Sequence, residues 1–470
     1  MMSHSAVSQV YSVAKAVAIM TVSALVIHGV HELAAIDLLS TIRKKWHRSG
    51  LATASRGLTE WADTWVSCGC FPHLSLLVGR LDEEGADEEL LFHATGSANR
   101  DRNTPCDRST IFRMYSMTKP VTTVAALILV DRGLLNIDDL VSKYIPSFAH
   151  IKVLCTDASA TSTANSYKVE DPVYPLTIRH LLTHTSGISY GLFGNSIPDQ
   201  LIRRLSGDEQ RNFYCNMTSQ QLCEVVAKVP LAFQPGSAFL YGLNNDVLGR
   251  VIEVISGESL ESFFQREIFS PLRMEDTMFY VPEQKKARLA DCYEQRSVCD
   301  AASTHASVCY KVSENMERDK SVRFPMLAGG GGLCATIDDY RRFACLLIRR
   351  GATEGGKQLL SEELVDAMTT NQLPGGTSLS EFSFEKGGFS ESIGGGIGYG
   401  FGVSVVTEPS LVRGGESCTR GEFGWGGMAS TWFFICPTKR LYAVLLTSLI
   451  PSSAFPIRPQ FRSLVHRIFK

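Results

Sequence analysis

The sequence has 470 residues, 44% of them apolar, and its 46 Lys and Arg residues nearly balance its 48 Asp and Glu residues. A chain of this length and apolar content can bury a large core in one or two lobes, so the composition excludes an intrinsically disordered protein. The near-neutral charge leaves no electrostatic footprint for nucleic acid or another polyanion, and it argues against partners of that kind.

Thirteen cysteines are scattered along the chain, and their odd number rules out a fully paired set of intramolecular disulfides. Cys68 and Cys70 form a C-x-C pair, but no second pair stands at the spacing of zinc ligands. We interpret most of the thirteen as buried apolar thiols, which leaves the redox compartment open. Neither a metal nor an organic cofactor is indicated.

The first 57 residues form an N-terminal segment that differs in character from a predicted domain over residues 58–470. Residues 16–27 are mostly apolar, a run short for a membrane span but suited to a signal peptide or a signal anchor. A helix packed on the body explains this run equally well, and the basic residues 42–48 fit either a membrane-proximal patch or a solvated helix face. Membrane association through residues 16–27 and the localisation, secretory or membrane-anchored against cytoplasmic, therefore stay open.

Beyond this segment, β-rich apolar runs near both ends of the predicted domain form two predicted hairpins. The runs are residues 74–81, 89–98, 430–435 and 441–449. An acidic turn joins the first pair, and the turn C-P-T-K-R joins the second.

Apolar residues at helical spacing predict five helices between the hairpins, several of them ended by glycine. These helices are residues 118–131, 177–183, 245–255, 260–269 and 337–350. Strands at both ends with helices between them predict an α+β fold, an antiparallel sheet flanked by helices with an all-helical lobe. The Gly-rich stretch 375–398 is a long connection, either a flexible loop or a lid over a site.

The sequence contains three S-x-x-K matches, and only one of them opens a long apolar helix. Ser116 and Lys119 stand three residues apart at the start of the predicted helix 118–131, so both side chains project from one helix face. The matches that begin at Ser12 and Ser383 lie in the N-terminal apolar segment and in the Gly-rich stretch, and we interpret both as accidental. A lysine amine desolvated by burial can accept a serine proton, which makes Ser116 a candidate nucleophile and Lys119 its base.

Around this motif, and over roughly residues 58–465, the chain resembles serine β-lactamases, penicillin-binding proteins and the esterases related to them. The resemblance rests on several motifs in a fixed order along the chain. They are IFRMYSMTKPVT (111–122), TIRHLLTHTSG (177–187), FQPGSAFLYGLNNDVLGRVIE (233–253), AGGGGLCATIDDYRRF (328–343), GYGFGVSVV (398–406) and GWGGMASTWFFICP (424–437). The resemblance implies the α+β fold of this superfamily. It also implies that Tyr241 is the catalytic tyrosine and that the backbone NH groups of Ser116 and Met428 form the oxyanion hole.

Two motifs depart from the pattern of true β-lactamases. Their second motif commonly reads Tyr-x-Asn, whereas this chain has Tyr241-Gly242-Leu243. Their third motif commonly begins with a lysine that holds a carboxylate, whereas this chain has Trp425-Gly426-Gly427. The chain therefore resembles the β-lactamase-like carboxylesterases more closely. We expect Trp425, Gly426, Gly427 and Leu243 to contact the substrate, because an uncharged aromatic wall suits an acyl or alkoxy group better than an anion.

Two other patterns admit different chemistry. His180 and His184 are four residues apart and could be a zinc pair on a helix, but position 181 is not Glu and the family uses this segment structurally. Ser189 lies in a G-x-S-x-G match, the signature of an α/β-hydrolase nucleophile elbow. A helical pattern precedes it where an elbow needs a strand, so we interpret the match as a turn.

The sequence thus predicts a serine hydrolase that cleaves carboxylic esters through an acyl-enzyme on Ser116. Its substrate is expected to be a small-molecule ester or amide. Two alternatives stay open, namely β-lactamase or D-amino acid peptidase activity on the same fold, and a non-catalytic scaffold or assembly protein. The sequence does not indicate the natural substrate or the oligomeric state.

Overall fold

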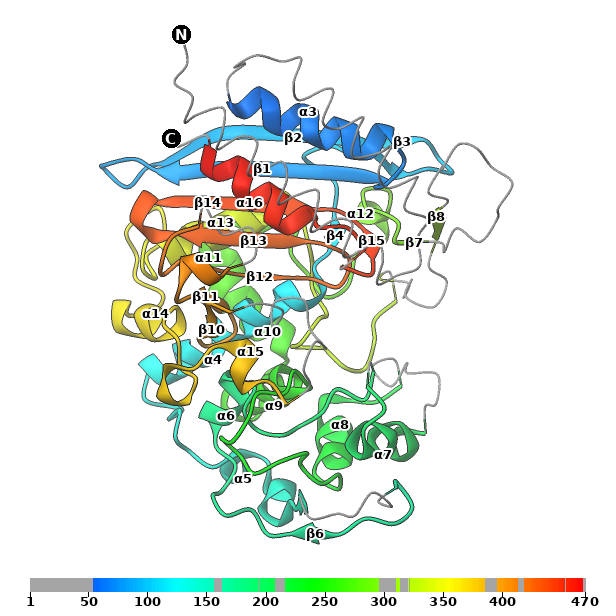
Figure 1. Cartoon of the computed structure of the whole chain (residues 1–470), viewed down its shortest axis with the longest axis vertical. Helices are drawn as coiled ribbons and strands as arrows, with labels where there is room; N and C mark the ends of the chain where they lie inside the picture. Colours follow the sequence, from blue (N-terminus) through cyan, green and yellow to red (C-terminus); the bar gives the residue numbers. More distant parts are fainter. Residues whose placement is uncertain are drawn as a thin grey trace.

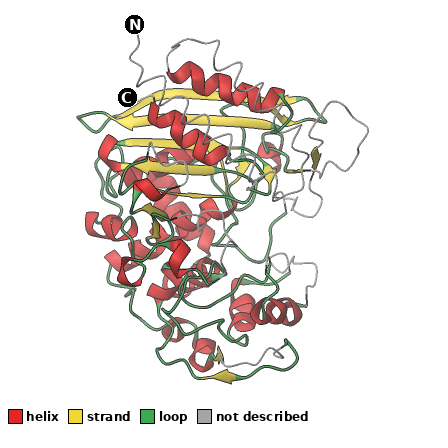
Figure 2. Cartoon of the chain, viewed as in Figure 1, coloured by secondary structure: helices red, strands yellow, loops and turns green. Residues whose placement is uncertain are grey.

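The computed structural model describes residues 54–155, 163–192, 194–207, 216–295, 310–312, 320, 322–384, 395–412, 418–452 and 454–467. In this part of the chain, an antiparallel sheet occupies one half of the molecule and a group of helices occupies the other (Figure 1). Figure 2 shows the long strands in yellow in the upper half, and red helices joined by green loops in the lower half. The predicted α+β fold with a helical lobe is confirmed.

The main sheet has eight strands in the order β10-β11-β12-β13-β14-β1-β2-β3. In chain order these are β1 (His73–Leu81), β2 (Asp87–Asn99), β3 (Thr104–Pro105), β10 (Ile397–Tyr399), β11 (Ser404–Val406), β12 (Phe423–Gly426), β13 (Trp432–Cys436) and β14 (Leu441–Leu446). Each neighbouring pair is antiparallel. Both predicted hairpins are present, and they join at the centre of the sheet because β1 pairs with β14.

The helices either cover the sheet or build the lobe and its connections. The first group is α3 (Ala54–Ser67), α13 (Ile337–Ile348) and α16 (Ile457–Arg467). The second group is α4 (Thr118–Asp131), α5 (Val141–Tyr144), α6 (Ile178–Leu182), α7 (Ile197–Ser206), α8 (Ser219–Val226), α9 (Asn244–Ser256), α10 (Leu260–Phe264), α11 (Ser270–Leu272), α12 (Glu283–Lys286), α14 (Glu362–Met368) and α15 (Leu379–Phe382). The structure confirms all five predicted helices as elements, with ends that differ by at most two residues except in the segment 260–269.

The two faces of the sheet bury different side chains, as the alternation of a strand requires. Leu74 and Leu76 of β1 face α3 and α16, where they join a cluster that includes Trp61 and Phe461. Leu77 points to the opposite face and joins the main core, which α4 and α13 share. Figure 1 shows α3 in blue and α16 in red over the strands β1 and β14. The sheet therefore lies between a two-helix cover and the rest of the helices.

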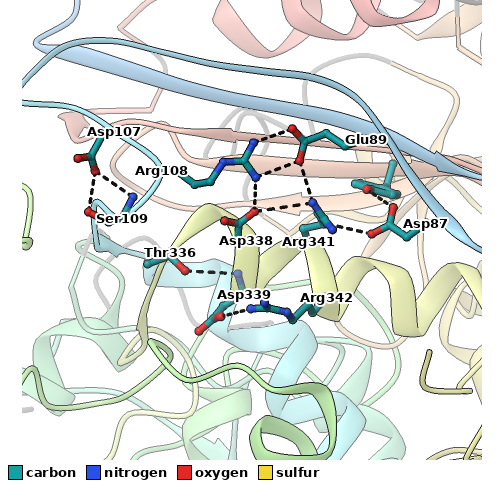
Figure 3. A network of polar contacts seen from close by, with 11 residues as sticks. Asp87, Glu89, Asp107, Arg108, Ser109, Thr336, Asp338, Asp339, Arg341 and Arg342 are labelled. Atoms are coloured by element: carbon teal, nitrogen blue, oxygen red, sulfur yellow. Dashed lines mark hydrogen bonds and ion pairs between the residues drawn. The ribbon is translucent and has the colours of Figure 1, made fainter. Parts of the chain in front are cut away.

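A network of ion pairs fastens α13 to β2 (Figure 3). Arg341 of α13 lies 2.9 Å from Asp87 and 2.8 Å from Glu89. Arg108 lies 2.6 Å from Glu89 and 2.8 Å from Asp338, and Arg341 also lies 3.8 Å from Asp338, so the two arginines share Glu89 and Asp338. Isolated exposed pairs contribute only about 0 to 1 kcal/mol each, but shared partners make these residues a single unit that orients α13 on the sheet.

Three segments differ in detail from the sequence prediction. The apolar run 441–449 is divided, because β15 (Leu449–Ile450) leaves the main sheet and pairs in parallel with β7 (Tyr293–Gln295). The run 260–269 changes from α10 to a π-helix at Gln265–Phe269. The Gly-rich stretch 375–398 contains α15, and its residues 385–394 lie outside the described residues.

Short strands complete the described part of the chain. They are β4 (Phe112–Arg113), β5 (Val153–Leu154), β6 (Val169–Glu170), β8 (Tyr310–Val312) and β9 (Cys334–Ala335). The predicted boundary at residue 57 lies inside α3. The apolar run 16–27 and the basic residues 42–48 lie outside the described residues. Among the residues that are described, no helix combines the length and the apolarity needed to cross a membrane.

The aromatic cluster under α3 and α16 gives a first testable prediction. Phe434 is fully buried, and its ring centroid lies 5.0 Å from that of Trp432 and 6.2 Å from that of Phe461. Phe434→Ala should lower the free energy of unfolding by about 3 to 5 kcal/mol, because it leaves a cavity between sheet and helices. Urea denaturation measures the change. Leu134→Ala is the control, since Leu134 is 55% exposed, and an equal loss in both variants would contradict the packing described here.

Candidate active site

Ser116 lies in a short 3₁₀-helix, Tyr115–Met117, that runs directly into α4. Its side chain is half-buried, whereas almost all of the first three turns of α4 is buried. The preceding residue, Tyr115, has a left-handed backbone with φ of 46°, a conformation that is strained for a non-glycine residue. Its hydroxyl lies 3.7 Å from the Sγ atom of Cys292, a contact that helps to hold the strained turn. The serine is thus presented at the start of a rigid, buried helix.

Lys119 is fully buried beneath Ser116. Its Nζ atom donates to Ser116 Oγ at 3.3 Å, to the hydroxyl of Tyr190 at 3.5 Å and to the carbonyl of Gly330 at 2.6 Å. The spacing of three residues brings both side chains to one side of α4, as predicted from the sequence. The structure therefore brings the candidate nucleophile and the candidate base together.

The electrostatics of Lys119 favour its role as a base. Burial lowers the pKa of Lys119 to about 7, and the nearby carboxylate of Asp246 opposes this shift. A large fraction of the amine is therefore neutral near pH 7 and can accept a proton from Ser116. Burial and the charge of Lys119 also hold the pKa of His184 well below its usual value, so this imidazole is neutral beside the amine.

The Gly-rich turn before α13 supplies the carbonyl that Lys119 contacts. The NH of Gly330 donates to Asp246 Oδ1 at 3.0 Å, and its carbonyl accepts from Lys119. A Cβ atom at this position would lie 2.5 Å from Asp246 Oδ2, which is why the turn carries glycine here. Gly330 thus links the acid on α9 to the amine on α4 through its own NH and carbonyl groups.

Tyr241 lies in the turn that leads into α9, with its ring centroid 4.6 Å from Lys119 Nζ. The indole Nε1 of Trp425 donates to the Tyr241 hydroxyl at 3.4 Å. The ring of His184 packs against the same tyrosine, with 4.8 Å between the centroids. The predicted catalytic tyrosine is therefore next to the predicted base, held by aromatic neighbours from β12 and from the turn after α6.

Tyr190 is a further member of this cluster that the sequence analysis did not identify. Its hydroxyl lies 3.5 Å from Lys119 Nζ, and its ring centroid lies 5.7 Å from that of Tyr241. The loop that carries it is fixed by Asp199, which accepts from the hydroxyl of Ser189 and, at 2.8 Å, from the NH of Gly191. A single tyrosine in a turn gives no pattern in the sequence, so only the fold reveals its position.

The residues predicted to contact the substrate lie around this cluster. Trp425 is fully buried, with its ring 5.7 Å from Tyr241 and 5.2 Å from Tyr399 between centroids. Leu243 is also fully buried and forms the N-cap of α9 within the main core. Both side chains are buried in this structure, and their contact with substrate stays a prediction.

The two glycines after Trp425 allow close contacts within the protein. A Cβ atom on Gly426 would lie 2.4 Å from the guanidinium carbon of Arg458 on α16, and one on Gly427 would lie 2.5 Å from the carbonyl oxygen of Met114. Strand β12 therefore touches α16 on one side and the turn before Ser116 on the other.

The predicted oxyanion-hole residue Met428 follows this strand. It is half-buried and packs on the same cluster as Tyr115, the residue before Ser116. The NH of the preceding Gly427 donates to the carbonyl of Thr431 at 2.8 Å. The turn after β12 thus lies beside Ser116, as an oxyanion hole built from Ser116 and Met428 requires.

The discounted motifs have structural roles. His180 Nδ1 accepts from the NH of Thr177 at 3.2 Å and caps α6, and His184 Nδ1 lies 2.7 Å from Asn244 Nδ2. Ser189 is buried in the loop after α6 and donates to Asp199. The part of the chain that the structure describes contains no group of three or more His, Cys, Asp or Glu residues suited to a metal ion.

Comparison with known proteins gives consistent matches across most of the chain. The family model described as Beta-lactamase matches residues 83–466. Esterase EstB from Burkholderia gladioli is 30% identical over 388 residues, which cover 79% of this chain and 86% of that protein. Lovastatin esterase from Penicillium rubens is 30% identical over 354 residues, 71% of this chain and 80% of that protein. The solved structure of EstCE1, a hydrolase with promiscuous acyltransferase activity, is similar with a TM-score of 0.66 and 24% identity, over 88% of this chain and 97% of EstCE1.

The pKa of Lys119 leads to a testable prediction about the pH dependence of Ser116. Only the neutral amine accepts the serine proton, so the rate at which a fluorophosphonate labels Ser116 should rise with pH and reach half its plateau near pH 7. The negative charge of Asp246 stabilises the ammonium form, so Asp246→Asn should lower the pKa of Lys119. The half-plateau point should therefore move to lower pH.

Glu253→Gln is the control for this experiment, because Glu253 is a carboxylate on the same helix that pairs with Arg250 instead. Its labelling profile should coincide with that of the wild type. A profile that shifts to higher pH in Asp246→Asn would contradict the assignment of Lys119 as the base.

Proposed function

Because the chain belongs to the β-lactamase family, we propose that this serine hydrolase is a carboxylesterase that works through an acyl-enzyme on Ser116. The observation that carries the proposal is the contact of 3.3 Å between Ser116 Oγ and the buried amine of Lys119, whose pKa is lowered to about 7. A neutral lysine in contact with a serine hydroxyl is an activated nucleophile. The predicted resemblance to this family is confirmed by the family match.

In the first half of the reaction, Ser116 Oγ attacks the ester carbonyl carbon while its proton passes to Lys119 Nζ. The carbonyl oxygen becomes an oxyanion, which the NH groups of Ser116 and Met428 stabilise. Each such donor contributes about 3 to 4 kcal/mol in comparable sites. The tetrahedral intermediate then collapses, the bond to the alcohol breaks and the acyl group stays on Ser116.

The leaving alcohol needs a proton, and the cluster around Lys119 supplies it. Tyr241 and Lys119 are adjacent, with the amine 4.6 Å from the centre of the phenol ring, so the proton taken from Ser116 can reach the alkoxide through either group. Water then attacks the acyl-enzyme and returns Ser116 to its starting state. The net reaction converts an ester and water into an acid and an alcohol.

Esters rather than β-lactams are favoured by two observations. The relatives EstB and lovastatin esterase are named as esterases, and both align over more than two thirds of this chain. At the position where the third motif of β-lactamases commonly has a lysine, this chain has Trp425, which packs with Tyr241 and Tyr399. An aromatic group cannot form the charge-assisted contact that a β-lactam carboxylate requires. The proposed substrate is a small-molecule ester.

Ser116→Ala tests the proposal directly. The variant should lose hydrolysis of p-nitrophenyl butyrate and labelling by a fluorophosphonate, because no other group replaces the attacking oxygen. It should fold as the wild type does, since the half-buried hydroxyl is removed without a change in the core. Initial rates, probe labelling and thermal unfolding measure these three outcomes.

Ser383→Ala is the matched control, because Ser383 begins another S-x-x-K match. It should retain both hydrolysis and labelling. Wild-type hydrolysis in Ser116→Ala would refute the assignment of the nucleophile, and a wild-type protein that neither labels nor hydrolyses would favour the scaffold alternative.

The preference for esters over β-lactams is a separate prediction. The absence of a charge-assisted contact costs about 1.5 to 3 kcal/mol, which corresponds to about a ten- to more than hundredfold loss of kcat/KM for an anionic β-lactam. The measurement compares kcat/KM for p-nitrophenyl butyrate with that for a chromogenic cephalosporin. Trp425→Phe, which keeps an uncharged ring, should preserve the preference. Equal turnover of both substrates by the wild type would favour the β-lactamase alternative instead.

A further inference from the structure

Helix α16 holds strand β12 from the face of the sheet opposite to Ser116. Arg458 donates through Nη2 to the carbonyl of Gly427 at 2.7 Å and to the carbonyl of Thr431 at 3.1 Å. Its guanidinium occupies the space that a side chain on Gly426 would take, with 2.4 Å to the position of the missing Cβ. Trp425, one residue earlier, points to the other face and packs on Tyr241. The arginine thus lies behind the active site, against the backbone of the strand.

The carbonyl that Arg458 contacts belongs to the peptide whose NH is that of Met428. In a trans peptide, the C=O and N–H bonds point in opposite directions. Because the Gly427 oxygen points towards Arg458 on α16, the Met428 NH points away from α16, towards the side of the sheet where Ser116 lies. On that side Gly427 approaches the carbonyl of Met114 closely, two residues before the nucleophile. One side chain therefore contacts the peptide that carries a donor of the proposed oxyanion hole, on the side opposite to that donor.

We infer that Arg458 is a positioning residue that orients and polarises the Gly427–Met428 peptide for stabilisation of the oxyanion. The inference rests on the proposed acyl-enzyme mechanism. A hydrogen bond from a guanidinium is charge-assisted, and it draws electron density towards the carbonyl oxygen. Hydrogen bonds polarise one another along a chain, so the NH on the other side of the same peptide becomes a better donor. Ser430 donates to the same carbonyl at 3.2 Å, but without a charge.

A second set of contacts fixes α16 independently of this peptide. Glu422, the buried residue just before β12, lies 2.8 Å from Arg462 Nε and 2.6 Å from His466 Nε2. Arg458, Arg462 and His466 are spaced by four residues, so they lie on one face of α16. Glu422 and its two partners attach the start of β12 to α16, and Arg458 attaches the turn that follows the end of β12. Removal of Arg458 therefore leaves the helix attached, which makes the variant a test of the peptide rather than of the fold.

The test compares wild type with Arg458→Met and Arg458→Lys. For p-nitrophenyl butyrate, Arg458→Met should lower kcat about 10- to 100-fold with little change in KM, because the lost interaction acts on the transition state. With an ester labelled by ¹³C at the carbonyl, the infrared band of the acyl-enzyme should move to higher frequency, since a weaker donor polarises that carbonyl less. Arg458→Lys keeps a cation that can donate to Gly427 and should restore part of both effects.

Arg462→Met is the control on the same helix, because Arg462 contacts Glu422 and not the Gly427–Met428 peptide. It should lower the melting temperature while leaving the carbonyl band in place. An unshifted band and wild-type kcat in a folded Arg458→Met would overturn the inference. So would the same change in Arg458→Met and Arg462→Met. A wild-type protein without any acyl-enzyme band would instead overturn the proposed function on which the inference depends.

Discussion

The burial of Lys119 is the constraint on which the rest of the site depends. A primary amine removed from water favours its neutral form, and the lowered pKa of Lys119 makes it a candidate base near pH 7. Such burial destabilises the protein unless the amine has partners, and the structure supplies Gly330 and Tyr190 as well as Ser116. Asp246 limits the shift and fixes the Gly330 peptide. The chemistry of the serine is thus a consequence of how α4, α9 and the Gly-rich turn pack.

The sheet contributes the complementary half of the site. Its centre joins two hairpins from the two ends of the predicted domain, so the turn after β12 has a fixed position relative to α4. Gly427 approaches the Met114 carbonyl, and Met428 packs on the same small cluster as Tyr115, so that turn lies against the candidate nucleophile. The proposed base lies in the helical lobe and a proposed oxyanion donor follows strand β12 of the sheet, so they come together only when both halves fold together. This arrangement explains why residues far apart in the sequence form one site.

The sequence predicted those parts of the molecule in which a local pattern specifies the structure. The helix that begins at Thr118 and both hairpins follow from apolar periodicity, and Ser116 and Lys119 are linked by a spacing of three residues. Tyr190 and Arg458 were not identified, because each acts through a contact with a residue distant in the chain. Helix α16 was also missed, although Ile457, Phe461, Leu464 and Val465 have the spacing of one face of an amphipathic helix. Three arginines and a proline stand between them, and the helix is stabilised by packing its apolar face on the sheet.

The proposed base and the proposed oxyanion hole require different electrostatic environments, and the position of Arg458 is compatible with both. In the proposed mechanism Lys119 must accept a proton and then release it, which a pKa near 7 allows, whereas the oxyanion is stabilised by positive charge. A cation placed inside the site would lower the pKa of Lys119 further and would also have to be desolvated. A cation on the far face of the sheet avoids both effects, because its influence reaches the oxyanion through the dipole of one peptide. Burial and Asp246 then determine the pKa of the base, and Arg458 acts on the strength and direction of the Met428 donor.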